Sequence, residues 1–368
     1  MYPFTGKHLL EERKIMKVVN GVCTSANIFT DNAEPYAIAQ IQMLCDNEAF
    51  RNSKIRVMPD VHPGKVGTIG FTATVMDRVL PNVVGIDIGC GITLAKLKQK
   101  KAEFQKLDKV IREQIPSGFQ IRKKPHRFAK EFEFDSLYCS RAINREKAEV
   151  SLGTLGGGNH FLELDKDEEG NLYVLIHSGS RHFGQEITEY YLREGQRILK
   201  KQGIEVPYEW TYLEGDFKEA YLHDVQKACI FAAWNRKCML DELAKGMKWK
   251  VEEVLDVCHN YAEQTEETWM IRKGAISAKK GEPVVIPINM KEGVLLGKGL
   301  GNKEWNESAP HGSGRILKRE EVGNRYTVSQ FKTEMKGFTV PVLEKRLWTK
   351  PPLPTGTWRR WRRTLERP

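Results

Sequence analysis

The alternation of apolar and polar positions predicts a series of β-strands in the first half of the chain. From about Lys54 to Lys98, apolar and β-branched segments alternate with glycine-containing loops, which is typical of strands joined by tight turns. The expected strands are KIRVMPD, GTIGFTATVMD, NVVGIDIG and ITLAKLK. Further along, NHFLELDKDEEGNLYVLIHSGS predicts a β-hairpin with its turn at Asp167–Asn171.

Helical spacing of apolar residues dominates two later segments, at about 184–201 and 215–247. Charged, helix-favouring sequence also covers roughly 102–150. Strand patterns return in TWMIRKGAIS and EPVVIPINM, followed by the glycine-rich run GKGLGN and a short helix expected near 327–336. Because no internal repeat and no clean linker interrupts these elements, we predict one large α+β domain with mixed sheets, surrounding helices and glycine-rich loops.

Composition indicates a soluble protein with a substantial core. The 368 residues are 40% hydrophobic, yet no apolar run approaches the roughly 20 residues that a membrane-spanning helix needs. The start of the chain has no apolar signal segment. The seven cysteines are odd in number, scattered and without a CxxC spacing, so they do not form a disulfide framework and favour a reducing compartment. We therefore expect a cytoplasmic protein with no membrane partner.

The net charge of +10 is weak evidence for nucleic-acid binding because it is unevenly distributed. Residues 345–368 hold eight lysines and arginines against one glutamate, so seven of the ten net charges lie there. The remainder of the chain is nearly balanced, and global basicity alone does not indicate a polyanionic partner. The basic run IRKKPHRF could contact phosphates, but a solvated face is the simpler interpretation. Its basic residues are Arg122, Lys123, Lys124 and Arg127.

Histidines supply the first sign of chemistry. Five of the nine stand beside glycine or in a polar loop just after an expected strand. These are His62, His160, His177, His259 and His311. A single histidine in such a setting is usually structural. Five together, with the carboxylate and thiol of the DIGC turn, are explained most simply by convergence on one metal site.

The DIGC turn places Asp87 and Cys90 three residues apart among glycines, which let the backbone fold tightly and a ligand approach closely. A thiolate can bridge two cations, whereas a neutral buried thiol cannot. The alternative is a small core cysteine beside a turn-capping aspartate. One thiolate, several imidazoles and a carboxylate would by themselves favour zinc or a mixed transition-metal site, and they do not indicate manganese.

Two glycine-rich motifs suggest phosphate chemistry. In SLGTLGGGNHFLE, three glycines before Asn159 could present backbone N–H groups to an anion, although the motif is neither GxGxxG nor a P-loop and an ordinary turn explains it equally well. GKGLGN fits a plain loop. In APHGSGR, His311 precedes glycine, and Arg315 follows four residues later. A sterically uncovered histidine can act as a covalent nucleophile, and a guanidinium can bind phosphate.

Taken in order, these motifs resemble those of the RtcB family of RNA ligases. The matching elements are PDVHPGK, VVGIDIGCG, LGTLGGGNHFLE, HSGSR, HNY, RKGAIS and PHGSGR, which extend over about residues 31–337. The resemblance implies a GTP- and manganese-dependent enzyme that joins RNA 2′,3′-cyclic phosphate or 3′-phosphate ends to 5′-hydroxyl ends, in tRNA splicing or RNA repair. It implies two Mn²⁺ ions, with RNA and GTP as partners, and we expect a monomer.

The resemblance also assigns roles to residues. Cys90 would bridge the two ions, with Asp87 and His160 completing one site and His177 and His259 the other. His311 matches the histidine that becomes guanylylated, and His62 belongs to a family motif without a ligand role. Apart from the resemblance, Arg181 follows the HSGS turn, so it could approach RNA phosphates. Positions matching the guanine-nucleotide contacts are Asn159, His160, Phe161, Leu162, Glu163, His259, Asn260, Pro287, Ile288, Asn289, Met290, His311, Gly312, Ser313 and Gly314.

The chain departs from the family pattern in places. Val66 stands where glycine is usual, and Val294 lies near the place of a nucleotide-contacting serine. Residues 338–368 contain three of the eight tryptophans and five of the sixteen prolines, and they do not resemble the family C-terminus with its nucleotide-contacting lysine. We interpret them as the product of a reading-frame shift; a basic, aromatic RNA-binding arm is the alternative. Residues 1–15 are interpreted as a non-native extension, which leaves 16–337 as the catalytic domain.

Three alternatives to an active ligase stay open at this stage. The first is a ligase inactivated by the atypical C-terminal segment. The second is a metal-dependent RNA cyclic phosphodiesterase or phosphatase that does not guanylylate. The third is a non-catalytic RNA-binding protein. Replacement of His311 by alanine separates an active ligase from the phosphodiesterase, because hydrolysis would survive it and ligation would not.

Overall fold

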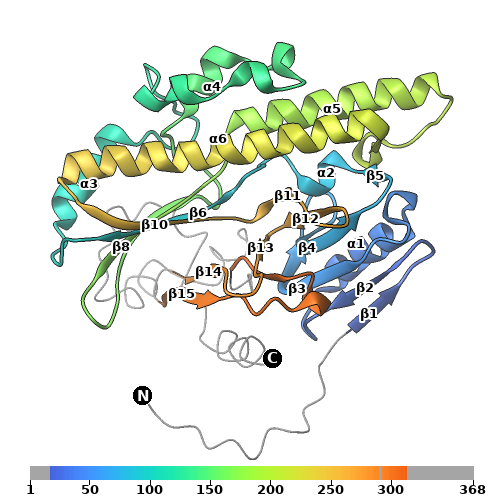
Figure 1. Ribbon diagram of the computed structural model, residues 1–368, viewed down its shortest axis with the longest axis horizontal. Helices are drawn as coiled ribbons and strands as arrows, with labels where there is room; N and C mark the ends of the chain where they lie inside the picture. Colours follow the sequence, from blue (N-terminus) through green and yellow to red (C-terminus); the bar gives the residue numbers. More distant parts are fainter. Residues whose placement is uncertain (1–16, 290–291, 313–368) are drawn as a thin grey trace, which may run out of the picture.

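A computed structural model describes residues 17–289 and 292–312, and the structural statements below concern these residues. Two sheets of unequal size lie at the centre of the fold (Figure 1). The larger has the strand order β1 (Lys17–Asn20), β2 (Ser25–Ile28), β3 (Ile55–Pro63), β4 (Thr68–Val75), β12 (Trp269–Lys273) and β11 (Asn260–Gln264). The smaller has the order β10 (Val251–Cys258), β6 (Gly91–Leu97), β8 (Leu172–Ser178) and β7 (Phe161–Lys166). Neighbouring strands are antiparallel except for the parallel pair β2 and β3.

Three two-stranded sheets and six α-helices complete the described architecture. The small sheets pair β13 (Ala275–Ser277) with β16 (Ser308–Pro310), β14 (Pro283–Asn289) with β15 (Gly293–Lys298), and β5 (Arg78–Val79) with β9 (Leu213–Glu214). The α-helices are α1 (Pro35–Asp46), α2 (Pro81–Val84), α3 (Phe104–Gln114), α4 (Arg145–Ser151), α5 (His182–Lys201) and α6 (Gly215–Met247). This mixture of sheets and helices confirms the α+β class.

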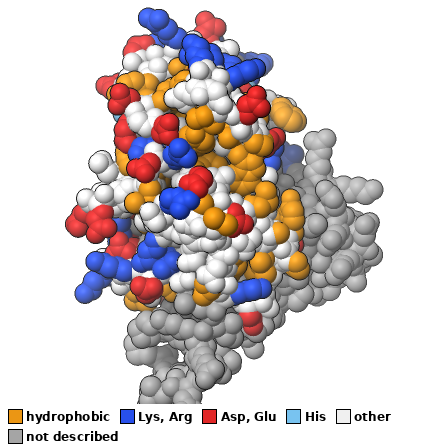
Figure 2. All heavy atoms as spheres, turned by 90° about the vertical axis from the view of Figure 1, so that its right-hand side faces the viewer, with side chains coloured by type: hydrophobic (Ala, Val, Ile, Leu, Met, Phe, Trp, Pro, Cys, Tyr) orange, Lys and Arg blue, Asp and Glu red, His pale blue; other side chains and the backbone are white. Residues whose placement is uncertain are grey.

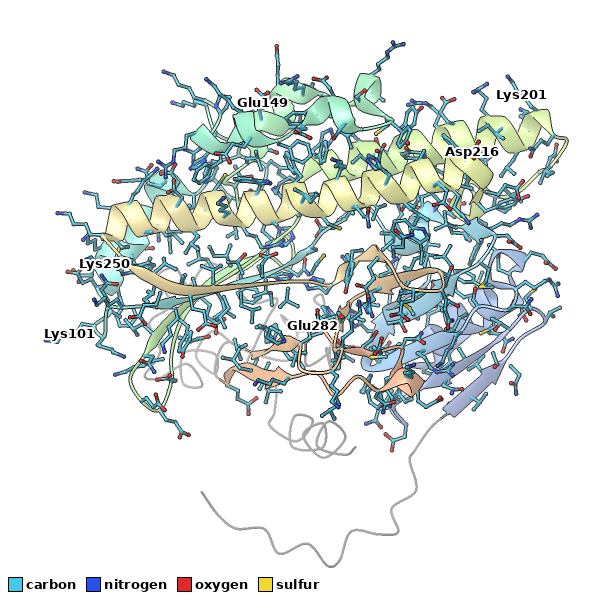
Figure 3. All side chains as sticks on the ribbon, viewed as in Figure 1. Lys101, Glu149, Lys201, Asp216, Lys250 and Glu282 are labelled. Atoms are coloured by element: carbon cyan, nitrogen blue, oxygen red, sulfur yellow. The ribbon has the colours of Figure 1, made fainter. Side chains whose placement is uncertain are left out.

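Helix α6 covers one face of the four-stranded sheet, and the other long helix, α5, packs against α6. Lys201 at the end of α5 and Asp216 at the beginning of α6 lie at the same end of the molecule, so the helices run antiparallel (Figure 3). Because side chains alternate between the faces of a strand, Ala95 and Val174 pack toward α6. Leu94 and Leu175 point to the opposite face, toward β14. The central strands β6 and β8 are therefore buried on both faces, whereas the edge strands β10 and β7 are partly exposed.

The helical periodicities predicted α5 and α6 correctly, and the hairpin was also correct. β7 and β8 pair antiparallel around a turn in which Asp167 N donates to Asn171 O at 3.1 Å and Asp167 Oδ1 accepts from Asn171 N at 2.7 Å. The strand expected at NVVGIDIG was wrong. Pro81 begins the short helix α2, and Gly85 ends it with φ of +89°, a conformation that favours glycine.

The region 102–150 is less regular than its helix-favouring composition suggested. α3 and α4 are separated by short 3₁₀ turns, Arg127–Glu131, Phe134–Ser136 and Ser140–Ala142. The helix expected near 327–336, like the segments 1–15 and 338–368, lies outside the described residues. Among the described helices, none has the length and apolar character to cross a membrane.

Charged side chains of both signs are mixed with hydrophobic ones on the face shown in Figure 2. In the basic run after α3, two arginines form ion pairs with carboxylates. Arg122 Nη2 lies 2.8 Å from Glu242 Oε1, and Arg127 Nη2 lies 2.6 Å from Asp241 Oδ1. Both carboxylates belong to α6, so these two arginines hold the segment against that helix.

Candidate metal centre

The five residues to which the family resemblance assigns metal-ligand roles meet at one end of the four-stranded sheet. They are Asp87, Cys90, His160, His177 and His259. Cys90 directly precedes β6, and His160 directly precedes β7. His177 is the penultimate residue of β8, and His259 directly follows β10. Asp87 lies in the loop between α2 and β6. In an antiparallel sheet the first residues of one strand lie beside the last residues of its neighbour, at the same end of the sheet. Residues distant in the sequence therefore converge there.

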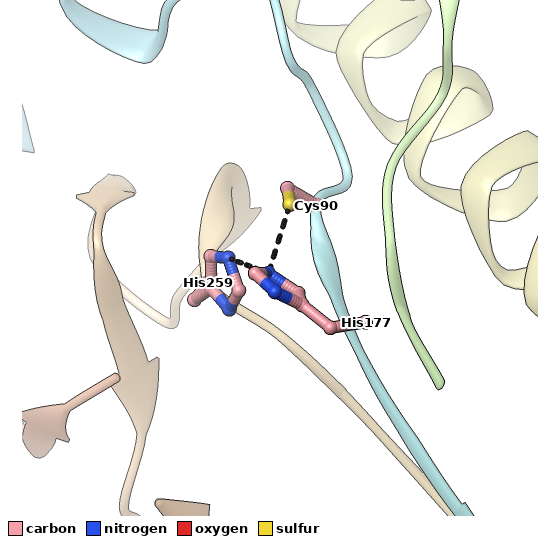
Figure 4. A group of neighbouring side chains, drawn as sticks. All are labelled: Cys90, His177 and His259. Atoms are coloured by element: carbon pink, nitrogen blue, oxygen red, sulfur yellow. Dashed lines mark hydrogen bonds between the residues drawn. The ribbon is translucent and has the colours of Figure 1, made fainter. Parts of the chain in front are cut away.

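Three of these residues form a buried group, Cys90, His177 and His259 (Figure 4). The Sγ atom of Cys90 lies 3.2 Å from His177 Nε2, which lies 3.3 Å from His259 Nε2. The residues are only 1%, 5% and 3% exposed, respectively. His259 is located where the chain passes from β10 in the smaller sheet to β11 in the larger, so it lies at the junction of the two.

A second group shares the same thiol and consists of Asp87, Cys90 and His160. His160 Nε2 lies 3.0 Å from Asp87 Oδ2 and 3.5 Å from Cys90 Sγ. Gly179 packs directly against this carboxylate, since a Cβ there would lie 2.1 Å from Asp87 Oδ1. Cys90 thus belongs to two adjacent groups, which is the arrangement a bridging thiolate requires.

Backbone carbonyls orient two of the imidazoles. His160 Nδ1 donates to Leu155 O, and His177 Nδ1 donates to Asn159 O, each at 2.9 Å. A proton on Nδ1 leaves the lone pair on Nε2, and in both rings Nε2 is the atom that faces Cys90. Metal-binding histidines are commonly oriented by a second hydrogen bond of this kind.

Burial and neighbouring charges set the protonation of the group. Burial raises the pKa of the Cys90 thiol well above its ordinary value, and the Asp87 carboxylate raises it further. Burial would also raise the pKa of Asp87, but the hydrogen bond and charge of His160 lower it overall. Burial lowers the pKa of His259 well below its ordinary value. At neutral pH, His259 is a neutral imidazole and Asp87 an anion; a divalent cation would displace the Cys90 proton.

These donors fit divalent transition-metal ions. Within each group the ligand atoms lie within 4.8 Å of one another, which allows one ion to contact all three. Each group offers three protein ligands, so positions would remain for water or substrate oxygens. Thiolate and imidazole are also the donors that zinc prefers, so ligand chemistry alone does not distinguish the metal.

His311 lies beside this centre. Its ring centroid is 4.9 Å from that of His259 and 6.4 Å from that of His62. Its Nδ1 atom lies 2.6 Å from Asp60 Oδ2, and the Asp60 side chain has no exposed surface. The carboxylate therefore fixes the orientation of the imidazole and holds a proton on Nδ1, which leaves the lone pair on Nε2.

The described positions that match nucleotide contacts cluster around the same place. Asn159 lies in the loop before β7, whose first three residues are Phe161–Glu163, and the Phe161 ring lies 5.2 Å from that of His177. Pro287 near the end of β14 meets the His311 loop, because a Cβ on Gly312 would lie 3.5 Å from Pro287 O. Met290, Ser313 and Gly314 lie outside the described residues.

Asn260 and Arg181 support neighbouring segments. Asn260 Nδ2 donates to Asp87 O at 3.2 Å, and its Oδ1 accepts from Gly274 N at 2.9 Å. Arg181 Nη2 donates to Gly118 O at 3.2 Å. The charge of Asp87 acts on the Arg181 guanidinium, although burial is the larger effect and lowers the pKa of Arg181. Arg181 therefore places a cation within electrostatic range of Asp87.

Sequence reasoning missed three residues near the centre: Asp60, Arg236 and Lys273. Asp60 lies in the PDVHPGK motif, in which the histidine is the more conspicuous candidate ligand. Arg236 and Lys273 are buried charged residues, 1% and 6% exposed, within ordinary helix and strand patterns. A charged residue on an otherwise apolar helix face was the available signal for Arg236.

Comparisons with known proteins agree with the family resemblance of the motifs. The family model described as tRNA-splicing ligase RtcB matches residues 44–347. The RNA-splicing ligase RtcB of Escherichia coli K12 is 29% identical over 316 aligned residues, which cover 74% of this chain and 76% of that protein. The tRNA-splicing ligase RtcB of Pyrobaculum aerophilum is 27% identical, with 76% of each chain covered.

Proposed function

This chain belongs to the RtcB family of RNA ligases, and from that premise we propose a specific reaction. The enzyme uses GTP and two Mn²⁺ ions to join RNA 2′,3′-cyclic phosphate or 3′-phosphate ends to RNA 5′-hydroxyl ends. It does so through a guanylyl group carried on His311. The observation that carries the proposal is the position of His311, oriented by Asp60 and adjacent to the candidate metal ligand His259.

The metal ions would be held by the two groups that share Cys90. Asp87 and His160 complete one site, and His177 and His259 complete the other. When bound, such ions offset negative charge on phosphoryl oxygens and orient the reacting groups. The choice of manganese over zinc rests on the family resemblance, because the donor set would accept either.

His311 carries the first covalent step. Its Nε2 lone pair attacks the α-phosphorus of GTP, a P–N bond forms, and the bond to the pyrophosphate oxygen breaks. The ring then carries a positive charge, which the buried Asp60 carboxylate stabilises through Nδ1–H. Without the carboxylate, the proton could reside on Nε2 and occupy the attacking lone pair.

Two further displacements complete the reaction. An oxygen of the RNA 3′-phosphate attacks the guanylyl phosphorus, which breaks the P–N bond and returns His311. The 5′-hydroxyl of the second RNA then attacks the activated 3′-phosphorus, and GMP leaves. This order solves a chemical problem, since a phosphate monoester has no good leaving group until GMP is attached. A cyclic phosphate end must first be hydrolysed to the 3′-phosphate.

The nucleotide is assigned to the surface formed by Asn159–Glu163, Pro287–Asn289 and the loop at His311. Arg181 is assigned to an RNA phosphate, because it follows the HSGS turn and its guanidinium interacts electrostatically with Asp87. For the nucleotide, the family resemblance supplies the ligand and the geometry supplies the proximity. The protein is expected to act on RNA in the reducing interior of the cell, where its unpaired cysteines persist.

The decisive experiment follows transfer of label from α-labelled GTP to the protein. Wild-type chain with Mn²⁺ should acquire acid-labile label, and His311→Ala should acquire none. His223→Ala is the matched control, because His223 is a partly exposed histidine on α6 whose Nδ1 bonds to Asp224, within a network apart from the metal-capable groups.

RNA with a cyclic phosphate end is tested in parallel. Hydrolysis of this RNA by a chain that takes no label would replace the ligase proposal with a phosphodiesterase. If neither activity occurs, the same assay with a family-type C-terminal segment in place of residues 338–368 decides whether that segment is responsible. Continued absence of label in that form would overturn the proposal.

A further inference from the structure

Helix α6 carries a fully buried arginine whose hydrogen bonds all end next to the metal centre. Arg236 is 1% exposed. Its Nη1 atom donates to two backbone carbonyls, Gly89 O at 2.9 Å and Ser178 O at 2.8 Å. Gly89 directly precedes Cys90, and Ser178 directly follows His177. One nitrogen therefore joins the two segments that hold the thiol and one of the imidazoles.

The other two nitrogens of the Arg236 side chain donate to a third segment, strand β10. Nε donates to Asp256 Oδ1 at 2.8 Å, and Nη2 donates to Asp256 Oδ2 at 2.6 Å. Asp256 lies on β10, three residues before His259, and it also accepts a hydrogen bond from Thr93 on β6. The planar fork of arginine makes both bonds at once, which fixes its orientation as well as its position.

We propose that Arg236 is a positioning residue for the group Cys90, His177 and His259, which it orders from the opposite side of the sheet without touching the ligands. The inference rests on the metal sites of the proposed function and adds a residue to them. The three ligand-bearing segments reach the site from β6, β8 and β10, neighbouring strands of one sheet, and each ligand lies at a strand end or just beyond it, where the pairing stops. A single rigid side chain bonded to all three fixes their relative placement.

Stability alone does not account for a charged side chain at this place. The Arg236 side chain is 1% exposed, and burying a charge costs so much desolvation that replacing an ion pair by apolar residues of similar volume is often neutral or stabilising. Other buried positions of α6 are filled by residues such as Phe231, Met239 and Leu243. The arginine differs from these by what it bonds to, which is the backbone on either side of the site.

The adjacent Asn235 acts in the same sense on the loop that leads to His160. Its Oδ1 accepts from Gly153 N at 2.8 Å and Thr154 N at 3.0 Å, and its Nδ2 donates to Gly179 O at 3.0 Å. Asn235 is fully buried. Consecutive residues of one helix thus bond to the segments that carry both groups, although the proposal depends on Arg236 alone.

The test uses Co²⁺ as a probe of the full-length chain, because a thiolate bound to Co²⁺ gives a charge-transfer band in the near ultraviolet. Arg236→Met should bind Co²⁺ about 10- to 100-fold more weakly and with a weakened or shifted band. Arg236→Lys should bind Co²⁺ with an affinity between those of Arg236→Met and wild type, because an ammonium cannot form two parallel hydrogen bonds to the Asp256 carboxylate. Activity is not needed as a readout.

Two further variants separate positioning from general loss of stability. Asp224→Asn removes a buried carboxylate from the same helix; it bonds to Tyr138 N, Cys139 N and Tyr191 Oη, away from the metal-capable groups. This variant should keep the wild-type affinity and band. The pair Arg236→Met with Asp256→Asn removes the buried guanidinium and its carboxylate partner together, so it should recover stability while its Co²⁺ site stays defective.

The outcomes are distinct. Wild-type affinity and band in folded Arg236→Met, or in the charge-free pair, would overturn the positioning role, and so would an equal loss in Asp224→Asn. If the wild-type chain gives no thiolate band and Cys90→Ser binds Co²⁺ equally well, the metal site itself is wrong and the inference falls with it. A wild-type band that is lost in Cys90→Ser and weakened in the Arg236 variants supports both.

Discussion

The imidazole of His311 and the carboxylate of Asp60 are joined by a hydrogen bond of 2.6 Å, between Nδ1 and Oδ2, although they lie 251 positions apart in the sequence. The same oxygen also accepts from the backbone N–H of His311 at 3.2 Å. Two bonds to one buried oxygen fix both the ring and its backbone. In a nucleophile this matters because the attacking atom must be unprotonated and correctly aimed.

Replacing Asp60 by Asn should strongly impair guanylylation of His311, although the two side chains have nearly the same size and shape. The amide can present N–H to Nδ1, which moves the ring proton to Nε2 and occupies the attacking lone pair. We expect the rate of label transfer from α-labelled GTP to fall by about 10²- to 10⁴-fold, the range seen when the aspartate of a catalytic histidine is neutralised. Asp135→Asn, at a side chain that is 95% exposed, is the control. Label transfer at the wild-type rate in Asp60→Asn would remove the carboxylate from the mechanism.

Cys90 should be the residue whose loss affects both metal ions. Because it is shared by the two groups, Cys90→Ser should lower binding at both, whereas His177→Ala should spare the group of Asp87 and His160. Mn²⁺ content after equilibrium dialysis, measured by mass spectrometry, should be near two ions per wild-type chain and about one for His177→Ala. Cys45→Ser is the matched control, at a fully buried free thiol in α1. Equal Mn²⁺ content in Cys90→Ser and wild type would contradict a bridging thiolate.

The sequence predicted those elements that carry a clear local pattern. In α5 the buried residues Phe183, Ile187 and Tyr191 recur at helical spacing, and α6 is long enough for the helical spacing to be detected although it contacts both large sheets. The hairpin of β7 and β8 was indicated by the polar turn between two apolar segments. α2 was mistaken for a strand because a four-residue helix has no period to detect. Pro81 and Gly85 determined its ends, which is local backbone chemistry rather than hydrophobic pattern.

The candidate ligands could be named from the sequence, whereas their supporting residues could not. Cys90 and the histidines stand in unusual glycine-rich settings, and the family resemblance assigned their roles. Asp60 and Arg236 act through contacts formed only when β3, α6 and the sheet edges come together. No spacing rule connects positions that meet solely through tertiary packing.

Gly156 should be required for the placement of Arg181 rather than for folding. A Cβ at Gly156 would lie 1.8 Å from Arg181 Nη1, which is the mobile end of that side chain and would be displaced. Gly203 has a similar backbone, with φ of +74° against +81°, and nothing within 4 Å. Both alanine variants should therefore lose about 1–2 kcal/mol of unfolding free energy from backbone strain.

Only Gly156→Ala should weaken RNA ligation, through a higher KM for RNA ends, while Gly203→Ala should retain wild-type kinetics. Urea unfolding and steady-state ligation rates measured on both variants check this. Equal kinetic losses in the two variants would mean that strain, and not the displacement of Arg181, is responsible.

Lys273 should give the protein a stability that rises with pH in the alkaline range. It is 6% exposed, and its Nζ donates to Val66 O at 2.8 Å and Asn82 O at 3.1 Å. Burial lowers its pKa from 10.5 to about 8. Between these values the unfolded chain binds more protons than the folded one, so the free energy of unfolding rises with pH. The cost of burying the charge is fully present below pH 8 and disappears as pH rises toward 10.5.

The variant Lys273→Met isolates this contribution, because other groups that titrate in the same range cancel when the two proteins are compared. The free energy of unfolding of wild type minus that of Lys273→Met should increase by about 3 kcal/mol between pH 7 and pH 11. Urea unfolding at one-unit pH intervals measures it. A difference that stays constant across the range would mean that Lys273 keeps its proton in the folded protein, and that the two carbonyl bonds compensate for burial of the charge.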